Sequence, residues 1–212
     1  MKLEKLFSSF ENKCKKFEKR ANYILEYSHS CDKWEFSYLT ETLISDLWQA
    51  WCNFCKALVL VSCRGTIDRS NNLIVKLNRD NTRLRILYEV SKNKAGQNIT
   101  TNGHNNFKSY NDITWGDLSL LIDAINYLSP NNKNKLLSSF GSMPILKELQ
   151  IVRNCMAHKN KDTLDNCKGI SSTYSSIKSP VEIVWSIDSA ENIPKIFVWL
   201  YYCHLMADNA TT

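Results

Sequence analysis

One short segment of the chain combines residue types that can carry out acid–base and phosphate chemistry. It reads Arg153-Asn154-Cys155-Met156-Ala157-His158. Histidine is the side chain best suited to move protons near neutral pH. Arginine can hold a phosphate in two-pronged contact and can stabilise added negative charge. An RNA strand supplies its own nucleophile, the 2′-hydroxyl, so a proton shuttle and a phosphate clamp are the minimum machinery for cleaving it, and no metal is needed.

The spacing places these groups at the end of a helix predicted over residues 145–159. At roughly 100° per residue, one apolar stripe of this helix should face the protein core, and it consists of Ile145, Leu149, Val152 and Met156. Asn154 and His158, four residues apart, lie together on the nearly opposite face. Arg153 lies at the edge of the stripe and can lean across the small side chain of Ala157. The pattern predicts an outward cluster of a guanidinium, an amide and an imidazole.

The same spacing has an ordinary structural interpretation. Basic residues are common in the last turn of a helix, where they complement the helix dipole. Three alternatives therefore stay open for Arg153 and His158: a catalytic pair, a site that binds RNA or a nucleotide without cleaving it, or surface residues of a dimeric or partner-docking bundle.

The segment ELQIVRNCMAHKN resembles the signature of the HEPN superfamily, small helical bundles that carry the motif R-x4-6-H. The resemblance covers about fifteen residues closely, and the predicted helix order is compatible with it over about 35–208. It implies a bundle of four or five helices that forms a homodimer in which two motifs face each other. It also implies a metal-independent endoribonuclease of toxin–antitoxin or antiviral-defence type, with Arg153 and His158 catalytic, Asn154 in support and no cofactor.

The chain departs from part of the HEPN pattern. Some HEPN toxins carry a tyrosine two residues after the histidine as a modification site, and this chain has Asn160 there. Some members of the superfamily are not catalytic. The resemblance therefore implies RNA as the main partner and an antitoxin or defence protein as a further one, with a non-catalytic RNA-binding, nucleotide-binding or scaffold module as the alternative.

The remaining sequence predicts the elements that position this segment. Apolar residues recur at spacings of three and four over 2–28 and over a wider face of 35–63, which indicates two long helices. Gly (6) and Pro (4) are scarce, which favours helices over a sandwich or barrel. We therefore expect a single all-α domain over 1–212, with an N-terminal helix (1–30), a core bundle of four to five helices (about 35–208) and a polar insertion loop (93–112).

The other predicted elements are less regular. Residues 70–92 should form an irregular segment followed by a short helix, and Thr114 should cap a helix that runs to about Leu128. A short helix is expected over 131–140. Residues 160–180 are polar, 181–187 should be a short strand or an irregular buried segment, and a last helix is expected from about Ser189 to Ala207.

Charge and cysteine content limit the class of protein. The formal net charge of +6 permits an acidic partner such as RNA and equally fits a solvated lysine-rich surface. No signal peptide or membrane span is apparent, so we expect a cytoplasmic protein, no membrane partner and eight cysteines present as thiols. The single C-x-x-C, Cys52 to Cys55, lies in a helical stretch and has no second metal-binding pair. Glu41 and Asp46 on the central helix line a groove or belong to a solvated face, and the solvated face is favoured.

Overall fold

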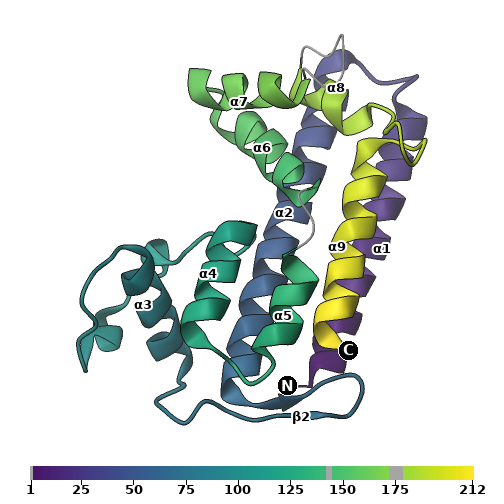
Figure 1. The fold of residues 1–212 in the computed structure, drawn as a ribbon. Helices are drawn as coiled ribbons and strands as arrows, with labels where there is room; N and C mark the ends of the chain where they lie inside the picture. The colour runs from purple at the N-terminus through teal and green to yellow at the C-terminus, as the bar shows by residue number, and fades with distance from the viewer. Residues whose placement is uncertain (1, 142–144, 172–178) are drawn as a thin grey trace. The chain divides into compact units, whose positions relative to one another are not determined.

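The computed structural model describes residues 2–141, 145–171 and 179–212. The chain is an all-α helical bundle with one small hairpin, in agreement with the fold class predicted from the sequence (Figure 1). Within this part of the chain the helices are α1 (Leu3–Tyr27), α2 (Lys33–Arg64), α3 (Arg83–Lys94), α4 (Leu118–Leu128), α5 (Lys133–Phe140), α6 (Ile145–His158), α7 (Lys161–Ser171), α8 (Pro180–Trp185) and α9 (Lys195–Thr211). The strands are β1 (Thr66–Ile67) and β2 (Leu73–Ile74), and two 3-10 turns are η1 (Gly103–Asn106) and η2 (Ser109–Asn111).

Packing divides the chain into two compact units. Unit 1 comprises Met1–Ser9, Cys52–Ser142 and Met206–Thr212, and unit 2 comprises Phe10–Trp51 and Met143–Leu205. Unit 1 has fourteen Lys and Arg residues against eight Asp and Glu, whereas unit 2 has thirteen of each. The whole formal net charge of +6 therefore belongs to unit 1.

The two long helices predicted near the N-terminus are present as α1 and α2. The buried residues of α1 recur at helical spacing: Leu3, Leu6, Phe7, Phe10, Cys14, Ala21 and Ile24. Helix α2 is buried around more of its circumference, because sequence neighbours such as Leu43 and Ile44, or Leu47 and Trp48, are both buried. Such a helix is covered on several sides. None of the helices among the described residues is long and apolar enough to cross a membrane.

In unit 1, α3 packs on α4 and α4 packs on α5 (Figure 1). Their most buried apolar residues are Ile86, Leu121, Ile125, Leu128, Leu136 and Phe140. The predicted irregular segment 70–92 contains β2, which pairs antiparallel with β1, and then α3. Gly65 precedes β1 with φ of 85°, and a Cβ on it would lie 3.1 Å from the Cβ of Lys76. Glycine is suited to this position because it adopts positive φ without strain.

Helix α4 begins later than the sequence predicts. Its N-cap is Asp117, whose Oδ1 accepts the N–H groups of Ser119 at 3.0 Å and Leu120 at 3.2 Å. Thr114, the predicted cap, instead contributes its backbone carbonyl, which accepts the N–H of Asp117 at 3.0 Å. Both residue types can cap helices, so the wrong prediction came from choosing the earlier of two suitable side chains.

Two helices of unit 2 were not predicted. Residues 181–187 were expected to be a strand or irregular, but they contain most of α8, which begins with a capping box. The Ser179 hydroxyl accepts the N–H of Glu182 at 3.2 Å, and the Glu182 carboxylate accepts the N–H of Ser179 at 2.8 Å. Pro180 occupies the first helical position, where its fixed φ is favourable.

Helix α7 lies in the polar stretch 160–180, of which residues 172–178 fall outside the described chain. Asn160 accepts the N–H of Thr163 through Oδ1 at 2.9 Å, an N-cap contact that starts α7. Helix α9 begins at Lys195 rather than Ser189, because Ile187 and Pro194 pair across the turn between them. Asn160 is therefore used to begin a helix.

The N-cap assignment predicts a difference between two substitutions. Asp117→Ala should lower the free energy of unfolding by about 1 kcal/mol, because it removes the side-chain acceptor for the first turn of α4. Thr114→Ala should change it much less. Urea denaturation measures both, with Asp123→Ala, an exposed acid on the same helix, as the matched control. A larger loss for Thr114→Ala than for Asp117→Ala would restore Thr114 as the cap.

Candidate active site

Helix α6 carries the Arg–Asn–His segment and belongs to unit 2. Its buried residues are Leu146, Leu149, Val152, Cys155 and Met156. The predicted core stripe is therefore correct for three residues and differs at its edge, where Cys155 is buried and Ile145 is only half-buried. Because Cys155 faces the core, Arg153 and Asn154 lie half-buried at the margin of the helix rather than fully in solvent.

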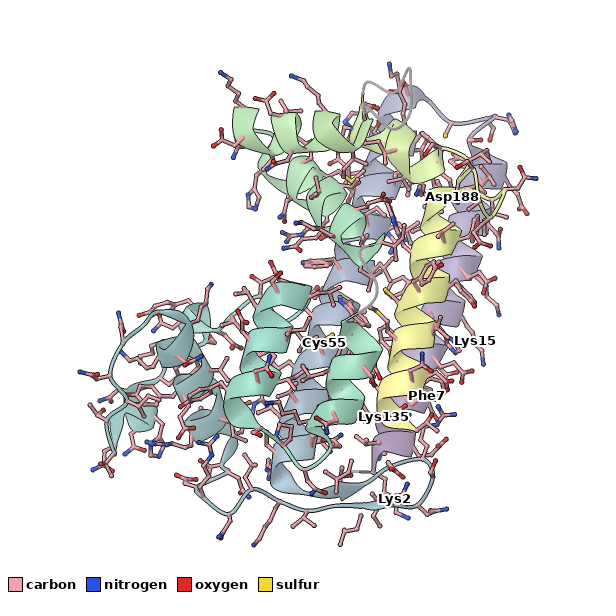
Figure 2. All side chains as sticks on the ribbon, viewed as in Figure 1. Lys2, Phe7, Lys15, Cys55, Lys135 and Asp188 are labelled. Atoms are coloured by element: carbon pink, nitrogen blue, oxygen red, sulfur yellow. The ribbon has the colours of Figure 1, made fainter. Side chains whose placement is uncertain are left out.

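A buried ammonium group fixes the first half of α6. The Lys195 side chain is 5% exposed, and its Nζ lies 3.1 Å from Glu148 Oε2 and 2.6 Å from Asp188 Oδ2. Asp188, labelled in Figure 2, lies in the segment that joins α8 to α9. Glu148 is on α6. The hydrogen bond from Lys195, with those from the N–H groups of Glu191 and Ala190, lowers the pKa of Asp188 below its ordinary value.

The second half of α6 is held by α2 and α7. Lys159 ends the helix with φ of 44°, and its Nζ lies 3.1 Å from Glu41 Oε1 on α2. On the other side the thiols of Cys155 and Cys167 are hydrogen-bonded. Burial and the neighbouring Cys155 raise the pKa of Cys167 to about 12, so this thiol stays protonated at neutral pH and joins α6 to α7 as a packing group.

Arg153 lines a cavity of about 260 Å³ between α2 and α6. The lining residues are Tyr38, Glu41, Thr42, Ser45, Asp46, Arg153, Met156 and Ala157. Glu41 and Asp46 thus line the cavity, as one of the two interpretations predicted, and the Asp46 side chain is also 47% exposed to solvent. Ala157 lies in the same cavity wall as Arg153, in keeping with the predicted course of the long side chain over a small residue.

The Arg153 guanidinium is only partly engaged. Its Nη1 donates to Asn154 Oδ1 at 3.1 Å, and its buried Nε has no hydrogen-bond partner. The two carboxylates of the cavity pair with other cations, since Asp46 lies 2.6 Å from Arg20 and Glu41 pairs with Lys159. No ion pair to Arg153 occurs in the described part of the chain, so both carboxylates of the cavity are paired with other residues and the Arg153 charge is not.

His158 does not share this cavity. It is the last residue of α6, its side chain is exposed, and it is not among the residues that line the cavity around Arg153. Five residues along a helix correspond to a rise of about 7.5 Å. The structure therefore brings Arg153 and Asn154 into contact and leaves His158 beyond the rim.

An exposed aromatic pair adjoins the cavity and was not predicted. The rings of Trp34 and Tyr38 are stacked, with centroids 5.6 Å apart and an interplanar angle of 7°. The side chains are 73% and 58% exposed, and Tyr38 lines the cavity. Exposed aromatic rings stack on nucleic-acid bases. The i, i+4 spacing of two aromatic residues at the start of α2 could have predicted this pair. The apolar face of the same helix made this spacing hard to recognise.

The rest of unit 2 sets the distance between α2 and α8. The indole Nε1 of Trp185 on α8 donates to Thr40 Oγ1 at 2.9 Å, and the ring of Trp185 lies 5.7 Å from that of Phe36. Helix α8 also packs on α6.

In the part of the chain that the structure describes, no three His, Cys, Asp or Glu side chains are grouped so that they could hold a metal ion.

Comparison with known proteins identifies no relative: no family model, no curated protein and no solved structure matches the chain.

The buried ion pair predicts how stability depends on pH. The pKa of Asp188 is lower in the folded protein than the unfolded value of about 3.9, so its pairing stabilises the fold above that value and the contribution is lost as the pH falls through the folded pKa. Asp188→Asn should lower the free energy of unfolding at pH 7 by on the order of 1–3 kcal/mol. The free energy of unfolding of this variant should also decrease less steeply than that of the wild type as the pH is lowered below about 4.

Urea denaturation at a series of pH values measures this effect. The control is Asp165→Asn, which removes an acid that pairs with Lys168 on exposed α7 and should change stability little. An unchanged acid slope in Asp188→Asn would contradict the assigned role.

Proposed function

We propose that this protein is a metal-independent endoribonuclease in which Arg153 and His158 are the catalytic residues and Asn154 positions Arg153. The observation that carries the proposal is the Arg153 guanidinium, which lines a cavity, has a buried Nε without a partner and contacts Asn154. A guanidinium with unused donors and no ion-pair partner among the described residues suits an RNA phosphate. The resemblance of the surrounding segment to the HEPN signature supports the same role.

In this mechanism the RNA supplies the nucleophile. A general base removes the proton from a 2′-hydroxyl, the oxygen attacks the adjacent phosphorus, and the bond to the 5′-oxygen breaks as that oxygen takes up a proton. The products are a 2′,3′-cyclic phosphate and a 5′-hydroxyl. His158 carries out one of these proton transfers, and Arg153 stabilises the additional negative charge on the phosphorane.

The exposure of His158 favours a site shared between two copies of the chain. Since His158 lies outside the cavity of Arg153, the histidine of a second copy can reach a phosphate held by the first arginine. The HEPN resemblance implies this arrangement. We therefore also propose a homodimer, a role in toxin–antitoxin or antiviral defence, and a regulatory partner protein.

The alternative is a module that binds RNA or a nucleotide without cleaving it. The separation of His158 from the Arg153 cavity is the observation that favours this alternative, because phosphate binding needs only the guanidinium. A scaffold role without nucleic acid is the remaining possibility. RNA binding at low salt, where electrostatic attraction is strongest, separates these two.

Cleavage of a labelled single-stranded RNA in EDTA tests the proposal. Arg153→Ala and His158→Ala should each lower the cleavage rate at least about 100-fold, the usual effect of removing a charge-stabilising group or a general acid–base. Arg64→Ala and His29→Ala, which change exposed residues that do not line the cavity, are the matched controls and should cleave as the wild type does.

The outcomes separate the candidate functions. Equal cleavage by all variants would contradict the assigned residues, and loss of activity in EDTA would contradict metal independence. Binding of RNA by the wild type with no cleavage would favour the non-catalytic module. Circular dichroism of each variant shows whether an inactive variant is folded.

The aromatic pair gives a separate prediction about RNA binding. If a base stacks on the exposed rings beside Arg153, Trp34→Ala and Tyr38→Ala should each weaken binding of single-stranded RNA by about tenfold, since one base–aromatic stack contributes about 1–3 kcal/mol. Fluorescence anisotropy with a 2′-O-methyl RNA measures binding without cleavage. Tyr23→Ala, which breaks the stacked Tyr23–Tyr27 pair on α1, is the control. An equal loss of RNA affinity in the control would show that exposed aromatic residues contribute to RNA binding wherever they lie, and would contradict a base-stacking site beside Arg153.

A further inference from the structure

The polar insertion 93–112 is fixed onto helix α3 at several points of unit 1. The Arg85 guanidinium donates through Nη1 to the backbone carbonyls of Thr100 and Thr101, both at 2.9 Å. Near the end of the loop, the Ser91 hydroxyl donates to the carbonyl of Asn111 at 2.6 Å. Polar loops need not be tied to a helix in this way, so these contacts indicate that the loop has a defined conformation over α3.

Tyr88 forms the centre of this arrangement. Its side chain is almost fully buried, and its hydroxyl oxygen accepts the N–H of Thr100 at 3.1 Å and lies 3.0 Å from Thr100 Oγ1. These two hydrogen bonds with Thr100 lower the pKa of Tyr88. A Cβ on Gly103 would lie 2.2 Å from the Tyr88 oxygen, so the loop approaches the ring more closely than any other residue at position 103 would allow.

Between α3 and this loop lies a cavity of about 610 Å³. Drug-sized and cofactor-sized ligands occupy cavities of roughly 300–1,000 Å³. None of the twelve lining residues is acidic. The polar and aromatic groups of the lining that matter for a ligand are the ammonium groups of Lys92 and Lys94, the amides of Gln97 and Asn98, and the rings of Tyr88 and Phe107.

Lys92 is held at the cavity by neutral groups. Its Nζ donates to Gln97 Oε1 at 2.7 Å and lies 5.8 Å from the centre of the Tyr88 ring. No carboxylate pairs with Lys92 or Lys94 in the described part of the chain. An ammonium without an ionic partner attracts an anion, and the surplus charge of +6 in unit 1 strengthens that attraction.

We infer that this cavity binds a nucleoside phosphate, either as a free nucleotide or as one unit of a single-stranded RNA. The two lysines contact the phosphate, the Phe107 ring stacks on the base, and the side-chain amides bond to the base edge. The site lies in unit 1, whereas Arg153 and His158 lie in unit 2, so the inference does not rest on the proposed cleavage activity.

Binding measurements with three probes test the inference: inorganic phosphate, AMP, and a 2′-O-methyl RNA hexamer that lacks the nucleophile for cleavage. The double variant Lys92→Ala/Lys94→Ala should weaken binding at least about tenfold and reduce the slope of log affinity against log salt by about 1 to 2. The matched control is Lys133→Ala/Lys135→Ala, which removes two lysines of the same unit that do not line the cavity. The control should bind as the wild type does.

Two further variants distinguish the parts of the site. Phe107→Ala should weaken binding of AMP and RNA by about tenfold and leave phosphate binding unchanged. Arg153→Ala should leave AMP binding unchanged, so a failure of the cleavage proposal cannot be mistaken for a failure of this one. Lys92→Gln/Lys94→Gln repeats the double variant with longer side chains, and thermal melting confirms that each variant is folded.

The three probes also identify the source of the nucleotide. AMP binding that depends on the two lysines supports a free nucleotide as the ligand, and binding of the RNA hexamer alone supports an RNA strand. Absence of binding by every probe, or an equal loss in the control pair, would overturn the inference.

Discussion

The ammonium group of Lys195 is almost completely buried between the carboxylates of Glu148 and Asp188. An unpaired charge in such a place costs far more than one ordinary contact can offset. Helix α6, the α8–α9 connection and the start of α9 must therefore meet at this point. This constraint holds the first half of α6, while the Lys159–Glu41 pair and α7 contact its second half. Arg153 lies between these two fixed ends, and its place in the cavity wall follows from them.

The two units of the chain differ in net charge, and they would therefore attract an anionic ligand in different ways. Unit 2 is electrically balanced, and its carboxylates are matched by basic residues, so Arg153 depends on local geometry for any attraction to a phosphate. Unit 1 has the entire surplus of positive charge and has a cavity without acidic residues. Long-range attraction of an anionic ligand would come mainly from unit 1, because surplus charge acts over a distance of about 8–10 Å at physiological salt.

The features that repeat along the chain were predictable from the sequence. The periodic apolar residues of α1, α2 and α6 identified three helices close to their true bounds, because burial of one face determines that pattern. Helices α7 and α8 were missed because their starts depend on short-range caps at Asn160 and Ser179, and α7 has few apolar residues. At Thr114 and Asp117 the same capping chemistry was available twice, and the sequence contains no signal that chooses between them.

The sequence predicted which residues of α6 belong to the candidate site, but it did not predict how they are arranged around the cavity. The contact between Arg153 and Asn154 follows from their adjacency, whereas the cavity depends on α2, more than a hundred residues away. Glu41 pairs with Lys159, and no local sequence pattern connects these two residues. The exposed state of Trp34 was also hidden, since an aromatic residue on a largely buried helix is usually part of the core.

Gly103 has a consequence that reaches beyond this one molecule. Its close approach to the buried Tyr88 hydroxyl excludes every side chain larger than a hydrogen atom unless Tyr88 moves, and Tyr88 is itself part of the cavity wall. A divergent descendant of this chain with any other residue at that position must move the Tyr88 ring or rebuild the loop. One codon therefore serves as a marker by which evolutionary retention of this contact between the loop and Tyr88 can be followed separately from retention of the Arg–Asn–His segment.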